Sequence, residues 1–315
     1  MNAITKAYIA LGLVCFFWGT TFIAARIGVS GYPAFFFMGC RNFTAGLVLL
    51  TIISVKKKTF PSIFTDIRWP DVRAQIIPGL LMICLGTGVV GWSVQFIPSG
   101  LAALIYCSVP ILTIAINTTF LKGERINSRI AIGMLLGVAG IFLIFRGNLN
   151  YIQDPQSLKG VIIALASCFF WCFGGLYTKI YVPKTDSFFN AAIQMMAGGL
   201  GLFVLSLISE DWAHLPVIGT KSLLALLYLI FFGSILAFGS FVYAMDRLPA
   251  GLVSIYAYIN PLVALTLGFL ILDEKISWMT LLAFGVTVSG VFLVNMGYRL
   301  EKRKLEEATI SVNHD

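Results

Sequence analysis

Residues 15–18 read Cys-Phe-Phe-Trp, and residues 168–171 read Cys-Phe-Phe-Trp again, each inside a long apolar run. The repetition continues downstream, where Ser-Gly-Leu at 99–101 corresponds to Ala-Gly-Leu at 250–252 and Pro110 corresponds to Pro261. The offset between the two copies is 153 residues at the first match (15 to 168) and 151 at the prolines (110 to 261). A repeat of about 150 residues is too long for a solenoid. It is typical of membrane transporters whose two halves enclose a shared site.

Composition places the chain in a membrane. Hydrophobic residues make up 58% and charged residues 11% of the 315 positions, whereas about 25% of residues are charged in a typical soluble domain. Crossing the hydrocarbon core takes about 20 consecutive apolar residues. The sequence therefore predicts an all-α integral membrane protein with ten transmembrane helices, near 7–27, 33–53, 74–95, 98–121, 129–146, 159–181, 187–208, 222–243, 250–272 and 278–297.

The positions of Lys and Arg predict how these spans are oriented, because basic residues accumulate in cytoplasmic loops. With the N-terminus in the cytoplasm, 16 of the 22 basic residues fall inside, five fall outside, and Arg41 lies within a span. Ten spans then place both termini in the cytoplasm, and five spans per copy make the second copy inverted relative to the first. We expect a first repeat at 1–146, a linker at 147–158, a second repeat at 159–298 and a cytoplasmic tail at 299–315, with a site near the bilayer midplane.

Nearly the whole chain resembles the drug/metabolite transporter superfamily, EamA type. The resemblance is carried by Phe-Phe-Trp-Gly-Thr-Thr at 16–21, by Arg41 in the second span, by the prolines of the fourth and ninth spans, and by Gly-Glu at 123–124. It implies a ten-helix transporter of a small polar metabolite, often an amino acid or related compound that is exported or exchanged, in a bacterial plasma (inner) membrane. In the second half, Arg41 is replaced by Gln194. A site between the halves would therefore be chemically asymmetric.

Arg41 is the only charged residue well inside a predicted span. An arginine at the centre of a spanning helix costs about 2.5–3.5 kcal/mol on insertion scales, so its side chain should face the bundle interior or an aqueous cavity. The alternative is that it reaches outward to lipid phosphates. The planar guanidinium suits a carboxylate or a phosphate, so a direct contact would favour an anionic group on the substrate.

Two prolines occupy matched positions in the fourth and ninth spans: Pro110 and Pro261. Each removes a backbone hydrogen bond and displaces the carbonyl four residues earlier. A bilayer tolerates such kinks only where protein or water satisfies the freed groups, and helix packing alone is the competing explanation. The polar side chains near these kinks are candidate substrate ligands, namely Tyr106, Tyr256, Tyr258 and Asn260. Together with a carboxylate on Arg41, they would fit a zwitterionic amino acid.

Trp18 and Trp171 lie deep in their spans, away from the membrane interfaces where tryptophan is usually enriched. Ordinary core packing would explain them. Aromatic walls on the two sides of a substrate cavity would explain them equally. In the second case, the polar partners in that cavity would be Thr20, Thr21, Tyr177 and Gln194.

Glu124 and Glu274 lie in short connections on opposite predicted membrane faces. Each is followed by a residue that can cap the next helix, Asn127 after the first and Ser277 after the second. We interpret the two glutamates as helix-start or gate-pairing residues.

Small residues spaced four apart occur in the fifth and tenth spans, a spacing that lets two helices approach closely. They are Gly133 and Gly137 in the fifth span, and Gly285 and Ser289 in the tenth. The pattern predicts contact between these spans or between two protomers, and it leaves a homodimer open.

An intramembrane enzyme is excluded as an interpretation because both histidines, His214 and His314, lie outside the spans, and no Asp or Glu lies well inside one. The six cysteines fall inside predicted spans as small apolar residues, so no metal site or cofactor follows. A receptor or scaffold would normally carry a soluble domain. Multidrug or cation efflux and sugar- or nucleotide-type metabolite transport stay open as alternatives. The expected partners are a small-molecule substrate and the lipid bilayer, with no nucleic acid.

Overall fold

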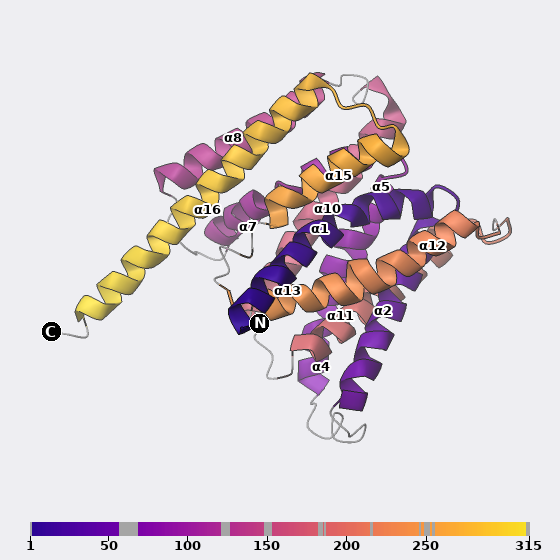
Figure 1. Cartoon of the computed structure of the whole chain (residues 1–315), viewed down its shortest axis with the longest axis horizontal. Helices are drawn as coiled ribbons and strands as arrows, with labels where there is room; N and C mark the ends of the chain where they lie inside the picture. Colours follow the sequence, from indigo (N-terminus) through magenta and orange to yellow (C-terminus); the bar gives the residue numbers. More distant parts are fainter. Residues whose placement is uncertain are drawn as a thin grey trace.

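The structure is a computed structural model that describes residues 2–56, 69–120, 127–147, 153–181, 185, 187–214, 217–245, 247–248, 253 and 256–312. Helices make up nearly all of these residues (Figure 1). They are α1 (Ala3–Val29), α2 (Ala34–Lys56), α4 (Trp69–Pro78), η1 (Gly79–Gly88), α5 (Val89–Ser93), α6 (Ser99–Tyr106), α7 (Val109–Phe120), α8 (Ser128–Gly147), α10 (Pro155–Ile180), α11 (Ser187–Ser209), α12 (Thr220–Tyr228), η2 (Leu229–Leu236), α13 (Ala237–Met245), α15 (Tyr256–Leu272) and α16 (Trp278–Val312).

Seven helical stretches within the described residues are long and apolar enough to cross a membrane: Ala3–Val29, Ala34–Val55, Trp69–Ser93, Pro155–Thr178, Phe188–Ser209, Thr220–Phe241 and Trp278–Gly297. Three shorter apolar helices coincide with the remaining predicted spans, at Ser99–Thr113, Ser128–Gly140 and Ile259–Leu272. The all-α membrane fold predicted from the sequence is confirmed. The exact number of ten spanning helices stays a prediction.

Helices from the two halves of the chain interleave. α2 packs along α11, and a Cβ added at Gly199 would lie 2.6 Å from the backbone nitrogen of Phe43. α1 packs against α15, where a Cβ at Gly19 would lie 2.6 Å from Val263 Cβ. Glycine at these two positions lets the backbones approach closely, as in other membrane helix pairs. The core therefore forms between the halves rather than within each of them.

The third predicted span of each half is π-helical at its centre. η1 separates α4 from α5 in the first half, and η2 separates α12 from α13 in the second half. Because π-helical turns are wider than α-helical turns and occur frequently at functional sites, these segments change the direction of side chains in the middle of both spans. The sequence pattern did not indicate them.

The fourth and ninth spans differ in how their prolines act. α6 ends at Tyr106 and α7 starts at Val109, so Pro110 lies in the first turn of a new helix, where a missing N–H is harmless. Pro261 lies inside α15, and the carbonyl four residues earlier, that of Ala257, accepts a hydrogen bond from Cys107 Sγ at 3.0 Å. The expected mid-helix kink is therefore wrong for Pro110, whose span breaks before it.

α8 and α16 lie side by side at one edge of the bundle, where they pack on α7 (Figure 1). Their backbones approach closely at Gly133 and Gly290, where a Cβ on either residue would lie 2.6 Å from the other's carbonyl oxygen. A Cβ at Gly285 would meet nothing within 4 Å. The predicted contact between the fifth and tenth spans thus forms, but through Gly290 rather than Gly285. Since these small-residue faces cover each other within one chain, they give no argument for a homodimer.

Candidate functional site

A cavity of about 160 Å³ lies between the two halves of the chain, and both halves contribute to its wall. The first half supplies residues from α1, α2, η1, α5, α6 and α7, and the second half supplies residues from α10, α11, η2, α13 and α15. No residue of α8 or α16 lines it in the described part of the chain. The helix pair formed by α8 and α16 is therefore not part of the described cavity wall.

Arg41 lies in the wall of this cavity on α2, and the residue is 9% exposed. Its Nε donates to the hydroxyl of Ser234 on η2 at 3.1 Å. No Asp or Glu among the described residues forms an ion pair with it. A guanidinium has five N–H donors, so most of its hydrogen-bonding capacity is left for a ligand or for water. The side chain thus faces the bundle interior and does not reach outward to lipid phosphates.

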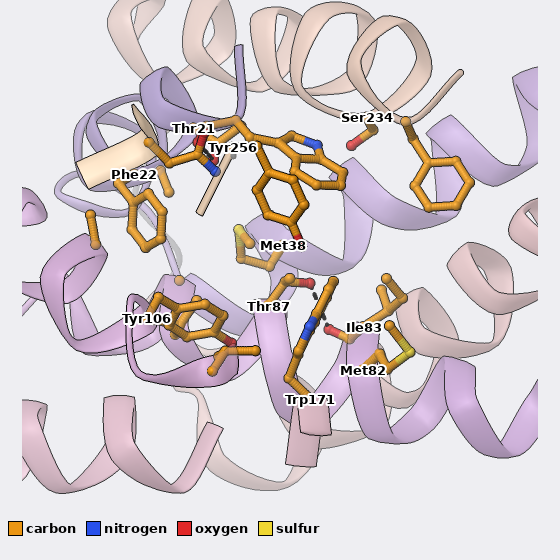
Figure 2. Close-up of a pocket in the computed structure, with 18 of the residues that line it drawn as sticks. Thr21, Phe22, Met38, Met82, Ile83, Thr87, Tyr106, Trp171, Ser234 and Tyr256 are labelled. Carbon is orange, nitrogen blue, oxygen red and sulfur yellow. Dashed lines mark hydrogen bonds between the residues drawn. The ribbon is translucent and has the colours of Figure 1, made fainter. Parts of the chain in front are cut away.

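Aromatic rings from both halves form opposite sides of the cavity (Figure 2). The rings of Trp18 and Tyr256 meet edge to face, with centroids 4.9 Å apart. Trp171 lies near Tyr106, with centroids 6.5 Å apart at an angle of 65°. Figure 2 shows Tyr256 pointing in from the side opposite to Trp171, with Met38 between them. The two tryptophans that begin the sequence repeat therefore face one shared space.

Several polar side chains of the wall are occupied by bonds within the protein. Thr21 Oγ1 donates to the carbonyl of Trp18 at 2.6 Å, and Thr87 Oγ1 donates to that of Ile83 at 3.2 Å. Hydroxyls in apolar helices commonly bond to their own backbone in this way. Because the proton of each hydroxyl is committed, these groups can offer a ligand only their acceptor positions.

The two amide side chains of the wall also have partners. Gln194 Nε2 donates to Oε1 of Gln75, a fully buried residue of α4, at 2.7 Å. In the orientation that satisfies both ends of its amide, Asn260 donates to the carbonyls of Tyr256 at 3.0 Å and Cys15 at 2.9 Å. Both amides therefore join the two halves of the chain across the cavity wall.

The hydroxyl of Tyr106 is buried and has no hydrogen-bond partner among the described residues. Ser167 is a polar neighbour of this hydroxyl, but its own hydroxyl donates to the carbonyl of Ala164 at 2.7 Å. Buried polar groups are almost always paired, and each exception needs an explanation such as an ordered water or a functional role. Tyr106 also lines the cavity, so its hydroxyl is a candidate group for binding a ligand.

The structure brings most of the predicted site residues to this cavity: Trp18, Thr21, Arg41, Tyr106, Pro110, Trp171, Gln194, Tyr256, Asn260 and Pro261. Tyr177 is not among them, because it stacks on Tyr181 with ring centroids 4.7 Å apart. Thr20 is also turned away, toward the hydroxyl of Tyr228 at 2.6 Å. Tyr258 belongs to α15, but its side chain lies outside the described residues, as does Glu124.

Sequence reasoning missed other polar members of the wall, namely Asn42, Thr87 and Ser234. Asn42 follows Arg41 and could have been suspected as an amide inside a span. Nothing in the sequence distinguishes Ser234 from the many hydroxyl residues that bond only to their own helix. Its role follows from the π-helical turn that presents it to Arg41.

Glu274 has the inter-segment partners that a gate-pairing role requires. Its carboxylate accepts from Arg26 Nη1 at 3.0 Å and from the backbone nitrogens of Ser99 at 2.9 Å and Gly100 at 3.2 Å. The polar residues that follow the two glutamates bond to the first turns of the next helices. Oδ1 of Asn127 accepts from the backbone two and three residues on, and Ser277 Oγ accepts from the nitrogen of Thr280.

A bundle of apolar helices in which two sequence copies enclose a shared cavity is the architecture of a polytopic membrane transporter. The profile of the EamA-like transporter family matches the chain twice, over residues 5–146 and 158–296. The chain therefore belongs to the EamA-like family of the drug/metabolite transporter superfamily, and it is a transporter rather than an enzyme.

Two bacterial relatives that carry the names of transporters match the chain over nearly their whole length. The chain is 33% identical over 291 residues to YedA, an uncharacterized inner membrane transporter of Escherichia coli strain K12, with 91% of this chain and 90% of YedA covered. It is 24% identical over 300 residues to the "Probable amino-acid metabolite efflux pump" of the same strain, with 92% and 95% covered. A solved crystal structure matches with a TM-score of 0.64 at 18% identity, over 93% of this chain and 97% of that one. At this identity, the structural match supports the fold alone.

Proposed function

We propose that the chain is a secondary transporter of a small metabolite that carries a carboxylate, an amino acid or a related compound, and that it works by alternating access to the cavity between its two halves. The observation that carries the proposal is Arg41, a buried cation that no described carboxylate neutralises and that lines the cavity. A charged side chain inside the membrane costs free energy unless an oppositely charged or polar group pairs with it. A substrate carboxylate is that partner, because it can accept two parallel N–H bonds from the guanidinium.

The rest of the wall favours a substrate with an apolar body. Trp18, Trp171, Met38 and Met82 line the cavity together with Phe238. Thioether and aromatic side chains adapt to apolar groups of varied shape. An amino acid with a hydrophobic side chain, or the corresponding acid, would match this surface better than a sugar, which needs many hydrogen-bond partners.

A substrate ammonium would be held by hydroxyls and ring faces, and the carbonyl of Ala257, which accepts one bond from Cys107, retains a second lone pair for it. The buried hydroxyl of Tyr106 has no hydrogen-bond partner within the described part of the chain, and Tyr256 lines the cavity as well. The face of Trp18 offers a cation–π contact, which is worth about 0.5–2 kcal/mol. A zwitterionic amino acid would then use both kinds of contact in one cavity.

The predicted arrangement in the membrane belongs to the same proposal. The repeats are taken as 1–146 and 159–298, joined by the linker 147–158, and both termini are taken as cytoplasmic because of the distribution of basic residues. Helix α16 continues from the last span to Val312, so the proposed tail at 299–315 begins as a helical extension. A bacterial plasma membrane is the proposed location, in keeping with the inner membrane location of YedA.

Efflux of lipophilic cations is the second candidate, and the apolar lining is the observation that favours it. Against it, the described residues of the wall include no Asp or Glu, and Arg41 would repel a cation. Anion or amino-acid exchange therefore agrees better with the charge of the cavity.

The test is counterflow in proteoliposomes. The purified protein is reconstituted, the vesicles are loaded in turn with unlabelled amino acids, the corresponding carboxylic acids, sugars, nucleosides or lipophilic cations, and entry of the labelled compound is followed. Saturable counterflow of a carboxylate compound that is lost in Arg41→Gln supports the proposal. Counterflow of lipophilic cations alone, unchanged in Arg41→Gln, would contradict it.

A further inference from the structure

Glu274 is the most heavily bonded carboxylate in the described part of the chain, and it lies beyond one end of the cavity. It follows α15 and is 8% exposed at its side chain. Besides the bonds from Arg26 and from the nitrogens of Ser99 and Gly100, it accepts one from Ser99 Oγ at 2.8 Å. One carboxylate from the second sequence copy thus holds the C-terminal end of α1 and the N-terminal end of α6, both from the first copy.

The backbone around Glu274 is shaped for this contact. Asp273 has φ of 51°, in the left-handed region that residues other than glycine rarely adopt. The nitrogen of Glu274 then bonds back to the carbonyl of Gly268 at 3.1 Å. A Cβ on Gly268 would lie 2.6 Å from Oε2 of Glu274. Strained conformations of this kind persist where the surrounding contacts determine them, and they concentrate at functional positions.

Each of the three segments joined by Glu274 also lines the cavity. Ala25 in the wall immediately precedes Arg26, and Ala103 in the wall lies one turn after Ser99. Several wall residues come from α15 itself. A substrate that leaves the cavity between α1, α6 and α15 can do so only if these helices separate at this end. Their separation removes the carboxylate from its donors.

We propose that Glu274, with Arg26, Ser99 and Gly100, forms a latch that closes one end of the substrate cavity and must open in each transport cycle. In the proposed orientation, this end faces the outside of the cell. The inference rests on the alternating-access function proposed above. Because the interaction consists of charge-assisted hydrogen bonds, it is strong enough to hold the closed state. It also involves only one side chain of the second copy, so it can be released in a single step.

Two substitutions weaken the latch by different routes. Glu274→Gln replaces an acceptor-only carboxylate by an amide whose two N–H donors compete with those of Ser99 and Gly100. Gly268→Ala keeps the charge but displaces the carboxylate with a methyl group. Asp154→Asn is the matched control. Asp154 caps the first turn of α10 through Ser157 and does not connect the two sequence copies.

The experiment measures access to the cavity from outside. A single reporter cysteine, Ala25→Cys, is placed in a background whose six native cysteines are replaced by Ala or Ser. Intact cells are then treated with a membrane-impermeant maleimide, without substrate. We expect Glu274→Gln and Gly268→Ala to label about tenfold faster than the reporter alone, since losing one charged hydrogen bond shifts an equilibrium by roughly this factor. Asp154→Asn should not change the rate.

Unchanged labelling in both latch variants, with normal amounts of folded protein in the membrane, would overturn the latch. Faster labelling only in inside-out vesicles would overturn its assignment to the outer end. If neither variant folds, Arg26→Gln replaces them, because it removes one donor and leaves the carboxylate on α6, and it should give a smaller rise. The assay needs no substrate. A wrong substrate class would therefore show up in counterflow and would leave the labelling result unaffected.

Discussion

Arg41 on α2 and Ser234 on η2 are joined by a hydrogen bond of 3.1 Å between Nε and Oγ, so that the only cation of the described cavity wall is positioned by a residue of the other sequence copy. The bond leaves the terminal nitrogens of the guanidinium free for a ligand. It also connects the substrate site to the π-helical turn at the centre of the eighth predicted span.

We expect Arg41→Gln to weaken binding of a carboxylate substrate about 10- to 100-fold, because a hydrogen bond to a charged group contributes about 1.5–3 kcal/mol. Arg41→Lys keeps the charge but loses the planar fork, so its loss should be smaller. Concentration-dependent counterflow gives the affinities. Ser234→Ala serves as the control for positioning and should have the mildest effect of the three. Equal transport by Arg41→Gln and the unmodified protein would show that Arg41 does not bind the substrate.

Tyr106→Phe should leave the protein as stable as before or slightly more stable, because the substitution removes a buried hydroxyl that has no partner. If a substrate supplies that partner, affinity should fall about 3- to 10-fold, as expected for a lost neutral hydrogen bond. Thermal unfolding in detergent and counterflow measure the two effects separately. A clear loss of stability would show that the hydroxyl is paired within the protein.

The contact between α8 and α16 can be tested with a matched pair of glycine substitutions. A methyl group at Gly290 would lie 2.6 Å from the carbonyl oxygen of Gly133, whereas one at Gly285 meets nothing within 4 Å. Gly290→Ala should therefore destabilise the protein by about 1–3 kcal/mol. Gly285→Ala should be neutral or slightly stabilising. Melting temperatures of the purified variants measure the two changes in stability. The opposite order would mean that the helices meet on other faces.

The orientation in the membrane predicts the outcome of reporter fusions. Fusions within 54–73, within 122–129 and at the C-terminus should report the cytoplasm, and fusions within 147–158 and 209–221 should report the outside, because basic residues favour the inner side. Alkaline phosphatase and green fluorescent protein give opposite readouts at each position. An external C-terminus would contradict both the even number of spans and the inverted repeat.

The charges of the cavity wall predict how transport is driven. Coupling of a cation's export to proton entry uses an acidic residue inside a span, and the described cavity wall contains none. We therefore expect weak accumulation in proteoliposomes under an imposed pH gradient, and faster entry of label when the vesicles are preloaded with unlabelled substrate. An uncoupler should have little effect. Strong uptake of a cationic dye that depends on the pH gradient would instead favour multidrug efflux.

The sequence by itself determined the membrane class, the two copies and the positions of most spans. Each of these properties can be recognised from a short stretch of sequence. About 20 apolar residues suffice to indicate a span, and a repeated motif indicates a repeated unit. The resemblance, the matched prolines and the depth of Arg41 also identified ten of the residues that line the cavity, since a residue that is costly in lipid must face the interior.

Only the tertiary structure decided which side chains meet. Ser234 and Arg41 are 193 residues apart, and Glu274 and Ser99 are 175 apart, so no local pattern relates them. Tyr177 is a further example: the sequence predicted it as a polar residue of the cavity, whereas in the structure its ring stacks on that of Tyr181. π-Helical turns rotate side chains in a way that an α-helical period does not predict. Contacts between distant helices depend on packing across the whole bundle, which a single span does not encode.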